Sequence, residues 1–144
     1  MPPLFNMLVI GYGNELRGDD GVGPKTAAAV EQLKLPGVRC LTRHQLTPEL
    51  AEEISRANKV IFVDAATGET EVRIREVAPA VDPVVRAHSA DPAALLTLGK
   101  QLFGTSPKAW MITIPVENTT FGEELSPRAR RGLETAVEEI KKLA

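Results

Sequence analysis

The fold is decided by the stretch Gly11-Tyr12-Gly13-Asn14-Glu15-Leu16-Arg17-Gly18-Asp19-Asp20-Gly21-Val22-Gly23. An apolar run, residues 7–10, leads into it, and a helix-like run, residues 25–33, leads out of it. A strand, a glycine-rich turn and a helix start in this order are typical of α/β proteins. In such proteins the functional crevice lies at the carboxyl ends of the strands.

The turn does not match the dinucleotide-binding fingerprint. The pattern G-x-G-x-x-G would need glycine at position 16, where this chain has Leu16. Asp19 and Asp20 stand where the helix begins, and two carboxylates there repel a phosphate. They suit a cation or a proton transfer instead. One aspartate can cap the helix, but a cap needs only one of them, so the other remains to be explained.

The length and composition of the chain argue against a nucleic-acid-binding, membrane-spanning or secreted protein. At 144 residues the chain is long enough for one domain with a core of its own, residues 1–144, and its net charge of −2 gives no basic face for nucleic acid. No apolar run is long enough to span a bilayer, and residues 1–4 do not resemble a signal peptide. The single cysteine, Cys40, lies in an expected strand and is interpreted as a buried structural thiol. We therefore expect a soluble cytoplasmic protein.

Strand and helix patterns alternate along the chain. This order predicts a three-layer α/β sandwich, with a mainly parallel sheet of about five strands and helices on both faces. The first, second, third and fifth strands should form the centre of the sheet. Alternation in residues 71–75 predicts a half-exposed edge strand with Val72 and Ile74 pointing inward. The expected strands are residues 4–10, 38–43, 59–64, 71–77 and 110–114, and the expected helices are 24–34, 48–56, 92–103 and 127–143.

Three polar residues should gather along the carboxyl edge of this sheet. Asp20 lies in the first turn, Asp64 ends the third strand, and His88 lies late in a long irregular stretch. Two carboxylates and an imidazole form a mixed ligand set, and imidazole suits nickel, zinc and iron. Three ligands would leave positions open for an external group. Each residue also has a simpler interpretation: Asp20 as a helix cap, Asp64 as a turn residue and His88 as an exposed loop histidine.

Other candidates are weaker. His44 follows the second strand and could belong to the same rim, whereas Glu15 fits a solvated loop tip. The chain has no G-x-S-x-G nucleophile elbow, and the sequence identifies no partner for Cys40.

The pattern G-x-G-N-x-L-x-x-D-D-G-x-G at residues 11–23 resembles the opening of the hydrogenase maturation endopeptidases. These enzymes remove the C-terminal extension from the large subunit of nickel–iron hydrogenases. The similarity continues through His44-Gln45-Leu46-Thr47-Pro48-Glu49-Leu50, Val60-Ile61-Phe62-Val63-Asp64-Ala65, the His88 segment with its following helix, Pro115, and Gly122-Glu123-Glu124-Leu125-Ser126-Pro127.

The resemblance implies roles for particular residues. The family's metal-contacting and catalytic positions fall on Asp20, Asp64 and His88. The nickel is already seated in the hydrogenase large-subunit precursor, so the enzyme needs only a partial ligand set and no tightly bound resting metal. The water that attacks the peptide can be activated by a metal or by a carboxylate, and the sequence does not choose between them.

Two other functions remain as alternatives. A non-catalytic, metal-sensing chaperone for hydrogenase assembly could use the same three residues. A receiver-type signalling domain also has acids after its first strand and an aspartate ending its third. It needs a lysine at the end of the fifth strand, however, and Ile114-Pro115-Val116-Glu117 offers none.

Overall fold

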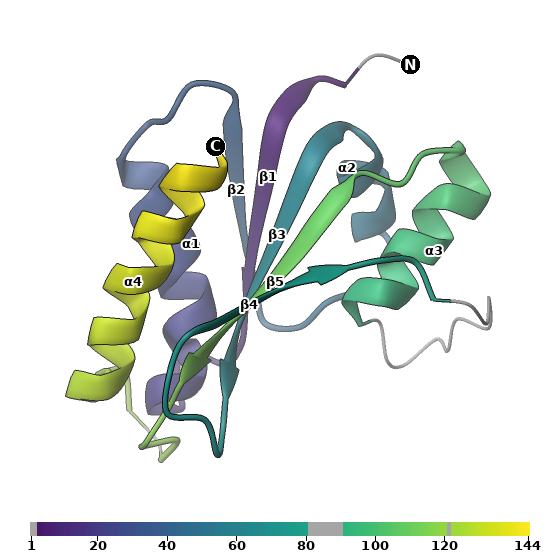
Figure 1. The fold of residues 1–144 in the computed structure, drawn as a ribbon. Helices are drawn as coiled ribbons and strands as arrows, with labels where there is room; N and C mark the ends of the chain where they lie inside the picture. Colours follow the sequence, from purple (N-terminus) through teal and green to yellow (C-terminus); the bar gives the residue numbers. More distant parts are fainter. Residues whose placement is uncertain (1–2, 81–90, 121) are drawn as a thin grey trace.

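A computed structural model describes residues 3–80, 91–120 and 122–144 (Figure 1). In this part of the chain, no helix has the length and apolar character needed to cross a membrane. The elements, in chain order, are β1 (Phe5–Tyr12), the 3-10 turn η1 (Gly18–Gly21), α1 (Val22–Gln32), β2 (Val38–Arg43), α2 (Leu50–Ser55), β3 (Ala57–Ala66), β4 (Arg73–Val77), α3 (Pro92–Phe103), β5 (Lys108–Pro115) and α4 (Pro127–Leu143).

The strands form one five-stranded sheet in the order β2-β1-β3-β5-β4. The pairs β1–β2, β1–β3 and β3–β5 are parallel, and β4 pairs antiparallel with β5. Figure 1 shows α1 and α4 on one face of the sheet and α2 and α3 on the other. The predicted three-layer sandwich with a mainly parallel sheet is confirmed. The second strand, however, lies at an edge rather than in the centre.

The two faces of the sheet bury separate apolar clusters because strand side chains alternate. Met7 and Val9 of β1 face α1 and α4, in one cluster with Val63 and Ile112. Leu8 and Ile10 of β1 pack in the other cluster, against α2 and α3. The central strands are therefore apolar almost throughout, as the sequence indicated.

Some boundaries and faces were predicted wrongly. The edge strand begins at Arg73, and Ile74 is 39% exposed instead of pointing inward, because β4 lies beyond the cover of α4. Val72 does pack against the cluster under α1 and α4. The helix expected from residue 48 begins at Leu50.

The glycine-rich turn brings the start of α1 directly onto the strand ends. A Cβ on Gly23 would lie 2.5 Å from the carbonyl oxygens of both Tyr12 and Val63, the latter in β3. Gly13 has a φ of +145°, and a Cβ there would overlap the carbonyl oxygen of Asp20. Backbone therefore packs on backbone, and η1 lies at the carboxyl ends of β1 and β3.

Replacing Gly23 by Ala should destabilise the protein. The added methyl group meets two backbone oxygens that cannot move aside, so we expect a loss of about 1–3 kcal/mol in the free energy of unfolding, measured with urea. Gly99 of α3 is the matched control. A Cβ there would lie 3.6 Å from the nearest atom, the Ala51 carbonyl oxygen, so Gly99→Ala should cost nothing or stabilise by up to about 1 kcal/mol. Equal effects of the two substitutions would contradict the tight packing at Gly23.

Candidate active site at the carboxyl edge

Tyr12, Asp64 and Thr113 form a row across the carboxyl end of the sheet. Asp64 pairs with Thr113, and the Gly11–Val63 pair places Tyr12 at the same level on β1. Asp64 shares the orientation of Phe62 two residues earlier, and Phe62 belongs to the cluster under α2 and α3. These three polar side chains therefore lie at the carboxyl end of the apolar cluster under α2 and α3.

Asp64 lies where an ionised carboxylate is disfavoured. Burial raises the pKa of Asp64 to about 6, and the negative charge of Asp20 adds to this rise. The N–H of Ala65, which donates to Asp64 Oδ1 over 2.8 Å, and the Tyr12 hydroxyl act in the opposite direction. The structure thus brings Asp20 and Asp64 close enough for their charges to interact.

Asp20 is held by the turn and does not cap α1. Its Oδ2 accepts a hydrogen bond from the N–H of Asn14 over 2.9 Å. The N-cap of α1 is Gly21, without a side-chain hydrogen bond. The simpler interpretation of Asp20 as a helix cap is therefore wrong.

Asp19 has a structural role that the sequence did not reveal. It is fully buried, and its Oδ2 accepts hydrogen bonds from the N–H groups of Glu117 (2.8 Å) and Asn118 (3.0 Å) and from the Ser126 hydroxyl (2.6 Å). Its Oδ1 accepts from the N–H of Ser126 over 2.6 Å. Burial alone would raise the pKa of Asp19, but these hydrogen bonds outweigh it and lower that pKa. Asp19 therefore ties the loop before α4 to the glycine-rich turn.

Tyr12 is a site residue that was not predicted. Its hydroxyl lies 3.8 Å from Met111 Sδ. Burial raises the pKa of Tyr12, and the charges of Asp64 and Asp91 raise it further, while Arg75 lowers it. Tyr12 occupies the variable position of the G-x-G pattern. Tyr12 lies two residues after Ile10, and side chains two residues apart on a strand point to the same face. This spacing could have placed Tyr12 on the same face as Asp64 from the sequence.

His88 lies outside the described residues, so its predicted position is not tested. Asp91, three residues later in the chain, caps α3 through a 2.7 Å hydrogen bond from Ala94 N–H and is near enough to Tyr12 to affect its pKa. Within residues 3–80, 91–120 and 122–144, no three His, Cys, Asp or Glu side chains are grouped as a metal ion would require. The three-ligand site therefore remains a prediction.

The weaker candidates are all exposed or half-buried. His44 is exposed and lines a depression of about 340 Å³ with Gly13 and Asn14, so it does lie on the same rim. Glu15 is exposed, which agrees with a solvated loop tip. Cys40 is half-buried rather than buried, and burial followed by the charge of Glu31 raises the pKa of its thiol to about 11. A thiol that resists ionisation is a poor nucleophile.

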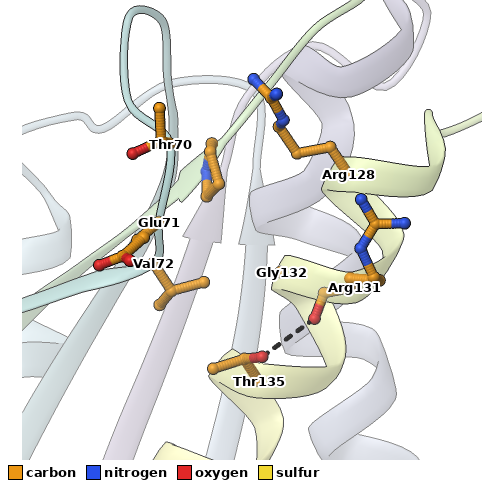
Figure 2. A pocket seen from close by; sticks show the side chains of 8 residues that line it. Thr70, Glu71, Val72, Arg128, Arg131, Gly132 and Thr135 are labelled. Atoms are coloured by element: carbon orange, nitrogen blue, oxygen red, sulfur yellow. Dashed lines mark hydrogen bonds between the residues drawn. The ribbon is translucent and has the colours of Figure 1, made fainter.

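A separate groove of about 460 Å³ lies between α4 and the segment that leads into β4. Figure 2 shows the side chains that line it. Arg128 and Arg131 of α4 line it from one side, and Thr70 and Glu71 lie opposite. Arg128 is paired with Glu117 over 3.2 Å. The groove lies on the α4 face, whereas Asp64 points to the other face, so it is not part of the candidate site.

Removing the charge of Asp20 should lower the pKa of Asp64. In the wild type the Asp64 carboxyl carbon should titrate in NMR near pH 6, and in Asp20→Asn it should titrate lower because the repulsion is lost. Since the folded-state pKa lies above the ordinary value of 3.8, ionisation of this group should cost stability as the pH rises from about 4 to about 6. Asp91→Asn is the control, because asparagine keeps the cap and Asp91 does not act on Asp64. Titration of Asp64 near pH 4 in the wild type would contradict the described environment.

Comparison with known proteins identifies the fold. No model of a known protein family matches the chain, and neither does any curated protein. Several solved structures do. HybD, a [NiFe] hydrogenase maturation protease from Thermococcus kodakarensis, is 22% identical, with 96% of this chain and 99% of that chain covered and a TM-score of 0.71. HycI, a [NiFe] hydrogenase maturation protease from Thermococcus kodakarensis KOD1, is 24% identical over 96% of this chain and 91% of its own, with a TM-score of 0.71.

The hydrogenase maturating endopeptidase HybD from E. coli is 21% identical, covers 94% of this chain and 89% of its own, and gives a TM-score of 0.68. These likenesses extend over nearly the whole chain, and they agree with the resemblance noted in the glycine-rich turn. The chain has the fold of the hydrogenase maturation proteases.

Proposed function

We propose that this chain is a single peptidase domain that removes the C-terminal extension of a nickel-loaded [NiFe] hydrogenase large-subunit precursor in the cytoplasm. The observation that carries the proposal is the pair Asp20 and Asp64, whose charges interact at the carboxyl edge of this fold. The solved structures of the same fold are named as hydrogenase maturation proteases and support the substrate class.

Recognition of nickel is assigned to Asp20, Asp64 and His88. The nickel belongs to the precursor, and its thiolates would hold it there. Two carboxylates and one imidazole would complete the coordination, so only a loaded precursor would be bound productively. Repulsion between Asp20 and Asp64 supports this assignment, because a divalent cation would relieve it.

Hydrolysis requires an activated water and a polarised carbonyl. Burial raises the carboxyl pKa of Asp64 to about 6, close to neutral pH, which suits a general base. The substrate's nickel could polarise the carbonyl or activate the water. In both routes, Asp64 must be ionised when the precursor binds.

The other functions predict different observations. A receiver-type domain belongs to the doubly wound class with strand order 2-1-3-4-5, whereas β4 here is an antiparallel edge strand beside β5. A non-catalytic chaperone would bind the loaded precursor and leave its length unchanged.

The decisive experiment mixes the protein with a nickel-loaded large-subunit precursor and measures the subunit mass. We expect a shortened subunit with the wild type and none with Asp64→Asn. Asparagine retains the oxygen that accepts from Ala65 N–H, so the fold should persist, but it loses the negative charge.

Glu15→Gln is the control, since it also removes one carboxylate charge near the turn, at an exposed position. It should cleave at the wild-type rate. Full activity of Asp64→Asn would remove the carboxylate pair from the mechanism, and an uncut precursor bound by the wild type would favour the chaperone.

The purified protein should carry little nickel. Three ligands form an incomplete site, and structural sites normally provide four. Elemental analysis after purification without added metal should therefore find far less than one nickel per chain, and binding should rise only with the loaded precursor. Stoichiometric nickel in the isolated protein would show that the site is complete without its substrate.

A further inference from the structure

Tyr12 is the only tyrosine of the chain, and it ends the first strand of the sheet. It lies beside Asp64 on the neighbouring parallel strand, and both side chains belong to the face that packs under α2 and α3. The position within G-x-G needs no tyrosine to form the turn, because the close contacts there are made by the flanking glycines.

The Tyr12 side chain reaches over β3. Its hydroxyl lies 3.8 Å from Met111 Sδ on β5, and Met111 pairs with Phe62, two residues before Asp64. Since β3 separates β1 from β5, the Tyr12 side chain must cross β3 to make this contact. A thioether is a weak acceptor, so it does not explain a hydroxyl at this point.

Within the part of the chain that the structure describes, the Asp64 carboxylate has one backbone restraint, the hydrogen bond that Asp64 Oδ1 accepts from Ala65 N–H over 2.8 Å. A single bond at one oxygen leaves the carboxylate plane free to turn. A second donor would fix the plane, and Tyr12 stands level with Asp64 on the neighbouring strand, on the same face of the sheet.

We propose that Tyr12 is a positioning residue, whose hydroxyl donates to the Asp64 carboxylate and fixes its orientation toward Asp20 and the open carboxyl edge. This inference rests on the proposed function, in which Asp64 contacts the substrate. The simpler interpretation is that Tyr12 only fills the core, since its ring packs against the cluster of Leu8 and Ile10. A phenylalanine would serve that purpose equally well.

Tyr12→Phe separates the two interpretations, because it removes the hydroxyl and keeps the ring. In the precursor-cleavage assay we expect kcat to fall roughly tenfold, as for a lost hydrogen bond to a charged group, with KM within about twofold. Met111→Leu is the matched control. It removes the other acceptor near the hydroxyl and keeps the bulk, so its kcat should equal that of the wild type.

A second measurement does not depend on activity. Because the chain has one tyrosine, tyrosine labelled with ¹³C at Cζ gives a single NMR signal that reports hydrogen bonding of the hydroxyl. This signal should move upfield in Asp64→Asn, where a charged acceptor becomes neutral, and should move little in Met111→Leu.

The outcomes distinguish this inference from the proposed function. Wild-type kcat in Tyr12→Phe, together with an inactive Asp64→Asn, would overturn the positioning role and leave the peptidase intact. An unchanged Cζ signal in Asp64→Asn would also overturn it, whether or not the precursor is cleaved. If the wild type does not cleave, the proposed function fails, and the NMR comparison alone decides whether Tyr12 orients Asp64.

Discussion

The close packing of the glycine-rich turn on the ends of β1 and β3 is the constraint on which the rest of the site depends. Gly23 lies against the carbonyl oxygens of Tyr12 and Val63, with no room for a side chain between them. This contact sets how near η1 comes to the end of β3. The interaction between Asp20 and Asp64 follows from it, since one carboxylate belongs to each element.

Asp19 and Asp20 are adjacent in the sequence, but their carboxylates meet opposite surroundings: hydrogen-bond donors surround Asp19, whereas Asp20 lies near another negative charge. Asp19 points into the protein and accepts four hydrogen bonds from Glu117, Asn118 and Ser126 in the loop before α4, which favours its ionised form. Asp20 accepts from the turn and faces a second carboxylate. The buried, hydrogen-bonded carboxylate of Asp19 stabilises the turn. This stabilisation offsets the repulsion between Asp20 and Asp64, so the turn can hold the two carboxylates close together. Like charges held close together by the surrounding structure are common at functional sites.

In the proposed mechanism, one environment of Asp64 serves both cation binding and proton transfer. Burial disfavours its charge, so a cation or a transferred proton gains more there than at the surface. The groups around Asp64 then determine which of its two carboxylate oxygens is free to bind a cation or accept a proton. Ala65 N–H donates to Asp64 Oδ1, and Tyr12 stands level with Asp64 on the neighbouring strand.

The sequence by itself determined the fold class, the edge strand near residues 71–77 and the location of Asp20 and Asp64 at the carboxyl edge. These features depend on local patterns, namely apolar runs, alternation and glycine spacing, which act within a few residues. Only the tertiary structure decided the separate roles of Asp19 and Asp20 and the place of Tyr12. Asp19 bonds to Ser126, 107 residues away, and Tyr12 contacts Met111, 99 residues away. No local pattern encodes such contacts, because they form only when the strand order brings distant segments together.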